Sequence, residues 1–129
     1  MYTNIDPEEG VTTIEKFIRY LAPSSFTPKV RDVILNLLRL AMRNCIFKFG
    51  DTWWLQNIGT AMGTPCACIY AILFFGYFER TIILRKYKAN LLLYKRQIDD
   101  VLGIWTDDIK NLTAWEDFKS DMKNACTLD

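Results

Sequence analysis

The chain has 129 residues, enough for one small domain or for part of a larger one, and its composition, 50% hydrophobic and 24% charged, excludes a disordered protein. The formal net charge of +1 gives no overall attraction for nucleic acid. The chain contains no histidine, which excludes the commonest general base and the usual catalytic triads. Any catalysis must therefore depend on carboxylates and bound metal.

Two helices are expected first. The run Asp6-Pro7-Glu8-Glu9-Gly10 is typical of a helix entry, because proline and acidic residues suit the first turn. Apolar residues then recur at helical spacing up to Pro23. After the Ser24-Ser25 break, a second apolar stripe runs from Val30 to Ala41. Both helices are most simply packing elements.

Residues 46–55 predict a β-hairpin, in which Ile46 to Phe49 and Trp53 to Leu55 flank Gly50-Asp51. The loop Gly59 to Pro65 follows, and its glycines allow another chain to approach the backbone closely. Taken alone, the loop predicts a junction into the next helix, with Thr64 as N-cap and Pro65 in the first turn.

The segment from Cys66 to Leu84 is apolar nearly all round, which predicts a helix enclosed by protein. Its longest apolar stretch, Ala67 to Phe78, is too short to span a membrane, and no membrane contact is expected. The four cysteines match no zinc spacing. Together with the absence of a secretory signal at Met1, they predict reduced, mostly buried thiols in an intracellular protein, the nucleus being one candidate compartment.

Two adjacent carboxylates, Asp99 and Asp100, lie between the strand-like segments Leu91 to Tyr94 and Val101 to Trp105. This pattern predicts a hairpin with both acids at its tip. Because burying unpaired carboxylates is costly, they either face water or neutralise a cation, and both alternatives stay open on spacing alone. Polymerases and nucleases hold two divalent cations in this way. A second pair, Asp107-Asp108, is more typical of a helix start or a solvated loop.

Basic residues without an intervening acid gather between residues 80 and 96. They are Arg80, Arg85, Lys86, Lys88, Lys95 and Arg96. This strip could meet a phosphate backbone, although a solvated helix end and turn explains it at least as well.

A last amphipathic helix carries Leu112, Trp115, Phe118 and Met122. The order of elements predicts the α+β class, with a small antiparallel sheet packed by helices and no linker dividing residues 1–129. A continuous apolar helix needs more cover than a chain of this size supplies, so we expect a single partial domain cut from something larger.

The run Leu55 to Pro65, LQNIGTAMGTP, followed about 35 residues later by Ile98-Asp99-Asp100, resembles the reverse transcriptase family. Within that family, Tyr2-Thr3-Asn4-Ile5 with Glu8-Glu9-Gly10, the glycine loop and the Arg96 to Trp105 run are most similar to Penelope-like retroelements. The resemblance covers essentially the whole chain and implies a partial palm domain, truncated at both ends.

The resemblance implies an RNA-directed DNA polymerase that extends a DNA primer on an RNA template, using deoxynucleoside triphosphates and two Mg²⁺. Asp99 and Asp100 would be the catalytic metal ligands, Asp99 the more direct one. Tyr2 would lie under the sugar and exclude a ribose 2′-OH, which argues against an RNA-templated RNA polymerase. The residues lining the template base and incoming nucleotide would be Gly59, Met62, Gly63, Thr64 and Pro65, with Gln56 and Gln97 nearby.

Two departures from the family pattern matter. The family's first metal-binding aspartate would fall about three residues before Met1. Without it the metal ions would be poorly held, so the isolated chain is expected to be inactive. The rest of the polymerase is expected in a longer chain. Gln97 stands where the family usually has an aromatic residue, and a glutamine can hydrogen-bond but offers no flat packing surface.

Two other functions remain open. One is a non-catalytic remnant of a retroelement that only binds nucleic acid, through the basic strip. The other is a helical interaction domain in which the motif is accidental.

Overall fold

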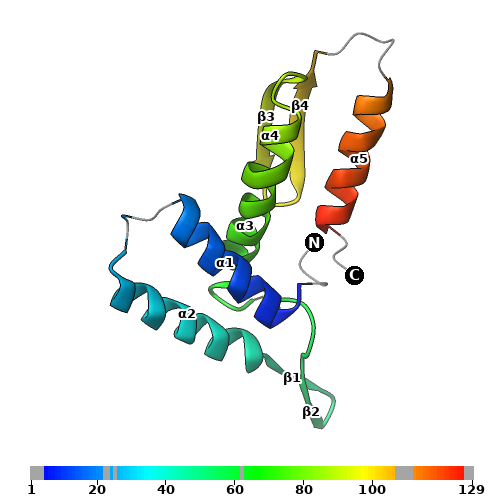
Figure 1. The fold of residues 1–129 in the computed structure, drawn as a ribbon. Helices are drawn as coiled ribbons and strands as arrows, with labels where there is room; N and C mark the ends of the chain where they lie inside the picture. The colour runs from blue at the N-terminus through cyan, green and yellow to red at the C-terminus, as the bar shows by residue number, and fades with distance from the viewer. Residues whose placement is uncertain (1–4, 22–23, 25, 62, 107–111, 127–129) are drawn as a thin grey trace.

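The structure is a computed structural model and describes residues 5–21, 24, 26–61, 63–106 and 112–126. In these residues the chain is α+β, as expected, and it contains two separate antiparallel hairpins (Figure 1). The elements in order are α1 (Pro7–Leu21), α2 (Pro28–Arg43), β1 (Ile46–Phe49), β2 (Thr52–Leu55), α3 (Ala67–Phe78), the π-helical segment η1 (Glu79–Ile83), α4 (Leu84–Lys86), β3 (Leu91–Gln97), β4 (Asp100–Trp105) and α5 (Leu112–Cys126).

The expected entry into α1 is confirmed. The Asp6 Oδ1 atom accepts hydrogen bonds from the backbone N–H groups of Glu8 and Glu9, at 2.9 and 3.0 Å. These bonds satisfy donors that the first helical turn leaves without a partner, and Pro7 needs no such partner because it has no N–H. Thr27 is the N-cap of α2, and its Oγ1 accepts a hydrogen bond from the Val30 N–H.

The first hydrophobic core lies around α1, which packs against α3 and against α2 (Figure 1). Its buried members are Ile5, Val11, Ile14, Ile18, Leu35, Met42, Tyr70, Ala71, Phe74 and Phe75. The Tyr70 hydroxyl is polar but satisfied, because it donates to the Pro7 carbonyl at 3.3 Å. Burial, helped by the carboxylate of Asp6, raises the pKa of Tyr70 well above its ordinary value, which keeps the hydroxyl protonated as a donor.

A second core joins η1, the β3–β4 hairpin and α5. Residues Ile83, Tyr87 and Phe118 are buried there, and the partly buried side chains around them are Leu91, Tyr94, Trp105 and Met122. The Phe118 ring contacts Tyr87 edge-on with a centroid separation of 5.2 Å and lies 5.3 Å from the Trp105 ring. The long helix formed by α3, η1 and α4 therefore serves both cores.

This long helix is covered on one side only. Ile69, Ile72 and Ile82 are 61%, 38% and 44% exposed, so the described residues cover the helix only in part, which agrees with the expectation that a chain of this size cannot enclose it completely. The helix also continues beyond the apolar run, from Ala67 to Lys86, which by length and composition is enough to cross a membrane. One such helix is weak evidence for a membrane span, because core helices pass the same test.

Two smaller expectations are wrong. Helix α3 begins at Ala67 with Cys66 as N-cap, and Thr64 instead accepts the Ala67 N–H through its backbone carbonyl in a preceding turn. Of the three cysteines whose side chains the structure describes, Cys45 is buried, but Cys68 is exposed and Cys66 is half-buried.

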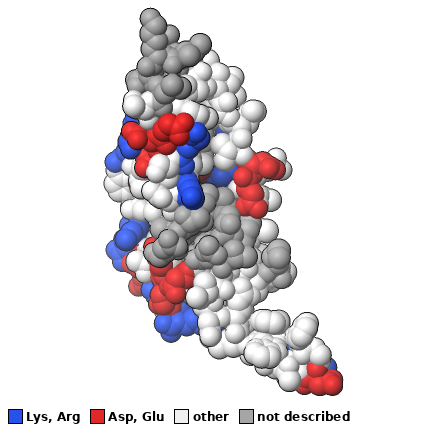
Figure 2. Space-filling model, turned by 90° about the vertical axis from the view of Figure 1, so that its right-hand side faces the viewer, with Lys and Arg blue, Asp and Glu red and all other residues white. Residues whose placement is uncertain are grey.

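The expected β1–β2 hairpin is confirmed and projects away from the body at one end of the molecule (Figure 2). All residues of both strands are exposed, including Phe49 at 75% and Trp53 at 70%. The Lys48 ammonium lies over the Trp53 ring, 5.9 Å from its centroid. The hairpin therefore takes no part in either buried core.

Candidate two-carboxylate site at the β3–β4 turn

The β3–β4 hairpin closes in a two-residue turn. Gln97 pairs with Asp100 in the strand register, which leaves Ile98 and Asp99 as the turn residues. The expected hairpin with both acids at its tip is confirmed, and both Asp99 and Asp100 are exposed. The two carboxylates therefore occur on successive residues at a surface that a ligand can reach.

The turn contains a strained backbone. Ile98 has φ of +56°, in the left-handed region. Tight hairpin turns favour this conformation because it matches the strand twist, but they normally use Asn, Asp or Gly. A β-branched residue held there costs on the order of 1–3 kcal/mol, which surrounding contacts must offset.

Those contacts come from Arg96, the residue before Gln97. Its guanidinium forms a bidentate pair with Glu79: Nε donates to Oε1 at 2.5 Å and Nη2 to Oε2 at 3.0 Å. The two side chains are only 8% and 13% exposed, and the Tyr94 hydroxyl also donates to Glu79 Oε1, at 2.6 Å. This is a buried, hydrogen-bonded ion pair directly behind the turn.

The same guanidinium ties the turn to α3. Arg96 Nη1 donates to the carbonyl of Ile98 at 2.9 Å, and Nη2 donates to the carbonyl of Ile72 at 3.2 Å. Asp99 lines a cavity of about 70 Å³ together with Glu79 and Arg96. The Arg96 side chain therefore links the turn to the long helix.

Glu79 lies where the long helix changes its winding. The π-helical segment starts at Glu79, and the N–H of Leu84 donates to the Glu79 carbonyl five residues earlier. Single π-helical turns inside α-helices are frequent at functional sites. Sequence reasoning missed both Glu79 and Tyr94; the available signal was an acid at the end of a long apolar run.

The glycine loop is hydrogen-bonded to the segment before α1. The Gly59 N–H donates to the Ile5 carbonyl at 3.0 Å, and Gln56 Nε2 donates to the Ile58 carbonyl at 3.0 Å. Gly59 and Gly63 have φ of +82° and +97°, which explains the choice of glycine at both positions. Apart from its chain neighbours, no described residue has an atom within 4 Å of a Cβ built on Gly63, so the loop is open there.

The loop, the start of α1 and the β3–β4 turn all converge on the first half of α3 (Figure 1). The Tyr70 hydroxyl reaches the Pro7 carbonyl, whereas the Ile72 carbonyl, two residues further along α3, accepts from Arg96. The structure describes Gly59, Gly63, Thr64, Pro65, Gln56 and Gln97, whereas Tyr2, Met62 and Asp107-Asp108 lie outside the described residues.

The basic strip is exposed at five of its six residues, and the exception is Arg96. Arg96 was expected to face a phosphate backbone, but its side chain is buried against Glu79. The Lys86 ammonium pairs with Asp121 at 2.8 Å, and Arg85 donates to the Tyr20 hydroxyl. The strip residues that are exposed are Arg80, Arg85, Lys86, Lys88 and Lys95.

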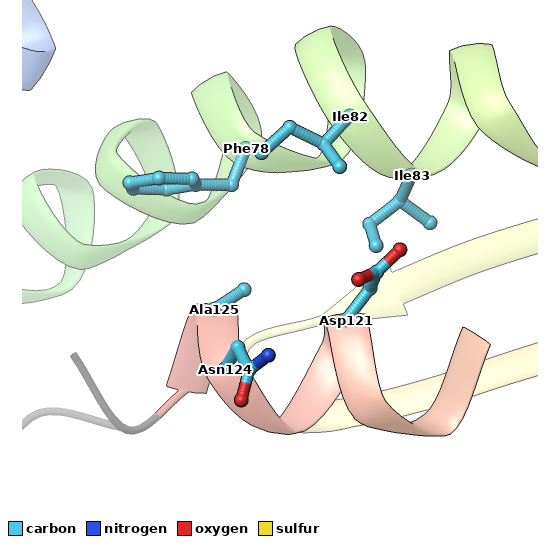
Figure 3. Close-up of a pocket in the computed structure, with 6 residues that line it drawn as sticks. All are labelled: Phe78, Ile82, Ile83, Asp121, Asn124 and Ala125. Carbon is cyan, nitrogen blue, oxygen red and sulfur yellow. The ribbon is translucent and has the colours of Figure 1, made fainter. Parts of the chain in front are cut away.

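A larger cavity of about 200 Å³ lies between the long helix and α5 (Figure 3). Phe78, Ile82 and Ile83 face α5 across it, and Asp121 is its one acid. The Asp121 carboxylate already accepts hydrogen bonds from Lys86 and Tyr87, at 2.8 and 2.7 Å. This cavity is therefore a gap in mainly apolar packing whose one acid is already hydrogen-bonded.

The donors at the turn fit part of a magnesium site. Carboxylate oxygens are the ligands that Mg²⁺ prefers, and Asp99 and Asp100 supply them on adjacent residues. Among the described residues there is no group of three or more His, Cys, Asp or Glu side chains that could hold a metal ion. A complete site therefore needs at least one further ligand.

Comparison with known proteins adds no relative. No protein-family model, no curated protein and no solved structure matches this chain.

Proposed function

We propose that the chain is part of the palm of a reverse transcriptase, of the kind found in Penelope-like retroelements, and that Asp99 and Asp100 bind the catalytic Mg²⁺ ions. The observation that carries the proposal is the two-residue turn, which presents two adjacent exposed carboxylates at the tip of an antiparallel hairpin. The glycine loop supports it at Gly63, which is exposed and has open space where a Cβ would lie, whereas Gly59, which was expected to line the nucleotide site, is buried.

In nucleotidyl transfer, two bound Mg²⁺ activate the attacking oxygen and stabilise the leaving one. Asp99 and Asp100 contribute carboxylate oxygens to that site. The glycine loop allows the template base and the incoming deoxynucleoside triphosphate to approach the backbone, and Gln56 holds the loop through Ile58. Because no group of three or more possible metal ligands is found among the described residues, we expect the 129-residue chain to bind metal weakly and to lack polymerase activity.

The first test is metal binding by the chain itself. Mn²⁺, a paramagnetic substitute for Mg²⁺, is expected to broaden the amide resonances of residues 98–101 before others. The double variant Asp99→Asn/Asp100→Asn should lose this broadening, whereas Asp51→Asn, which changes an exposed acid at the other hairpin turn, should keep it. Broadening that is absent, or that survives loss of both aspartates, contradicts the proposal.

The second test is activity. A protein extended upstream of Met1 by its own reading frame is expected to extend a DNA primer on an RNA template with Mg²⁺, and Asp99→Asn should abolish the extension. If the extended protein shows no Mg²⁺-dependent synthesis, the polymerase proposal fails.

A non-catalytic nucleic-acid-binding remnant is the second candidate, favoured by the exposed cations Arg80, Arg85, Lys86, Lys88 and Lys95. It predicts RNA binding that weakens with salt, with a slope of about −0.7 per phosphate neutralised on a single strand, and that survives loss of both aspartates. Binding lost in Asp99→Asn/Asp100→Asn, or insensitive to salt, contradicts this candidate. A helical interaction domain with an accidental motif would show neither metal nor RNA binding.

A further inference from the structure

We infer that Glu79 and Arg96 are positioning residues: the buried pair holds the Ile98-Asp99 turn in its left-handed conformation and thereby sets where the two carboxylates point. The consequence for metal affinity rests on the proposed function. The effect on the turn itself does not, because it follows from contacts among the described residues.

The guanidinium makes contacts that no other side chain could combine. Its Nε and Nη2 atoms donate to the Glu79 carboxylate, whereas Nη1 donates to the Ile98 carbonyl and Nη2 also donates to the Ile72 carbonyl. A planar fork with several donors in fixed directions is required for this. A lysine ammonium supplies a similar charge without the fork, so it could pair with Glu79 but not hold both carbonyls in the same geometry.

The carbonyl that Arg96 holds belongs to the peptide leading into Asp99. The N–H···O bond to Ile98 is 2.9 Å, and Ile98 is the described non-glycine residue with positive φ. Fixing this peptide plane fixes the backbone from which the Asp99 side chain departs. A strained conformation persists only where its surroundings determine it, and this bond is the contact that acts on it directly.

Glu79 is in turn held in place from the strand side. Tyr94 and Arg96 are two residues apart on β3, so their side chains lie on one face, and both donate to Glu79 Oε1. The π-helical turn begins at the same residue. The carboxylate therefore has a defined position between helix and strand, from which it orients the guanidinium.

Stability alone does not explain a buried ion pair. Taking two charges out of water is costly, and well-packed apolar side chains of similar volume often stabilise a fold equally well. Apolar side chains could not donate to the Ile98 carbonyl, however. The property that distinguishes Glu79 and Arg96 from an apolar pair is thus their control over the turn.

The test uses the variant Glu79→Met/Arg96→Met, which removes both charges together and leaves no uncompensated one. Arg96→Lys is the conservative variant, and Glu15→Met/Arg19→Met, which removes an exposed pair on α1, is the matched control. Folding is checked by amide dispersion. The intraresidue Hα–HN NOE cross-peak of Ile98 is strong only where φ is positive, so its intensity measures the conformation of the turn. Titration with Mn²⁺ measures the metal affinity of the two carboxylates.

We expect the Ile98 cross-peak to weaken in Glu79→Met/Arg96→Met and in Arg96→Lys, and the Mn²⁺ affinity to fall about tenfold or more, as for residues that orient metal ligands. The control should change neither. An unchanged cross-peak in a folded variant overturns the inference. If the double variant does not fold, Arg96→Lys decides with the same readouts. If the wild-type chain binds no Mn²⁺ at Asp99 and Asp100, the proposed function fails, while the cross-peak still decides the positioning role.

Discussion

Gly10 shows how one residue type is selected by a distant side chain. Glycine inside a helix costs about 1 kcal/mol relative to alanine, so local propensity disfavours it in α1. A Cβ at this position would lie 1.7 Å from the Tyr70 hydroxyl oxygen and 2.4 Å from its Cζ. Tyr70 is 1% exposed and hydrogen-bonded to the Pro7 carbonyl, so it cannot move aside freely.

The variant Gly10→Ala is therefore expected to destabilise the protein by about 1–3 kcal/mol, because the overlap outweighs the gain in helix propensity. The measurement is urea unfolding. Gly103→Ala is the control, since the nearest atom to its new Cβ would be the Leu93 carbonyl oxygen at 3.5 Å, an ordinary contact. A Gly10→Ala protein as stable as the wild type would show that α1 and α3 can move apart without a cost in stability.

Asp121 makes the stability of the second core depend on pH. Hydrogen bonds from Lys86 and then Tyr87 hold the pKa of Asp121 below its ordinary value. A lowered pKa in the folded state stabilises the protein above the ordinary pKa, and this stabilisation is lost as pH falls through the folded value.

We therefore expect Asp121→Asn to lower the free energy of unfolding at neutral pH, and the difference from wild type to shrink between about pH 5 and pH 2. Denaturant unfolding across this pH range measures it. Asp117→Asn, at an exposed site on the same helix, should leave the difference near zero throughout. If the loss of unfolding free energy in Asp121→Asn does not vary with pH, the lowered pKa of Asp121 is not its cause.

At the scale of single elements, α3 is the clearest case of one-sided burial. Phe74 is 0% exposed and contacts the rings of Phe75 and Phe78 at centroid distances of 5.5 and 5.1 Å. Ile69 on the same helix is 61% exposed. Composition does not distinguish the two faces, because both are apolar.

Phe74→Ala is expected to cost about 3–5 kcal/mol, because it removes a buried ring and leaves a cavity. Ile69→Ala should change stability by no more than about 0.5 kcal/mol, as surface substitutions usually do. Thermal and urea unfolding of the two variants compare the faces directly. Equal losses would mean that Ile69 is covered in solution.

At the scale of the whole molecule, two hydrophobic cores share one helix. The first lies under α1 and α2, and the second lies between η1, the β3–β4 hairpin and α5. The candidate site lies on the second core's side, since Arg96 is in β3 and Glu79 begins η1. Local opening of the second core would therefore disturb the turn while the first core stays folded.

Ile83, 1% exposed, belongs to the second core, so Ile83→Ala should weaken that core by about 2–5 kcal/mol. We expect native-state hydrogen exchange to show faster exchange in β3, β4 and α5, with the slow amides of α1 retained. Leu35→Ala, in the first core, is the matched variant and should show the reverse pattern. Uniform acceleration in both variants would show that the two cores unfold as one unit.

The sequence alone was sufficient to predict the type and order of the main helices and hairpins, although not the start of α3 or its π-helical segment. The apolar spacing in α1 and α2, the acids and proline at Asp6 to Glu9, and the apolar segments around Asp99-Asp100 are local signals, and the structure has helices and a hairpin at those places. Local backbone preference and side-chain periodicity act within a few residues, which is why they can be predicted without a fold.

Only the tertiary structure decided which residues support the site. Glu79 and Arg96 are 17 positions apart, and their pairing depends on how a helix and a strand pack. Arg96 looked like one member of a basic strip because sequence shows charge but not burial. For the same reason, incomplete cover of the apolar helix was predicted, but the face of α3 that stays exposed was not. Both faces are apolar, and long-range packing decides which one the neighbouring elements cover.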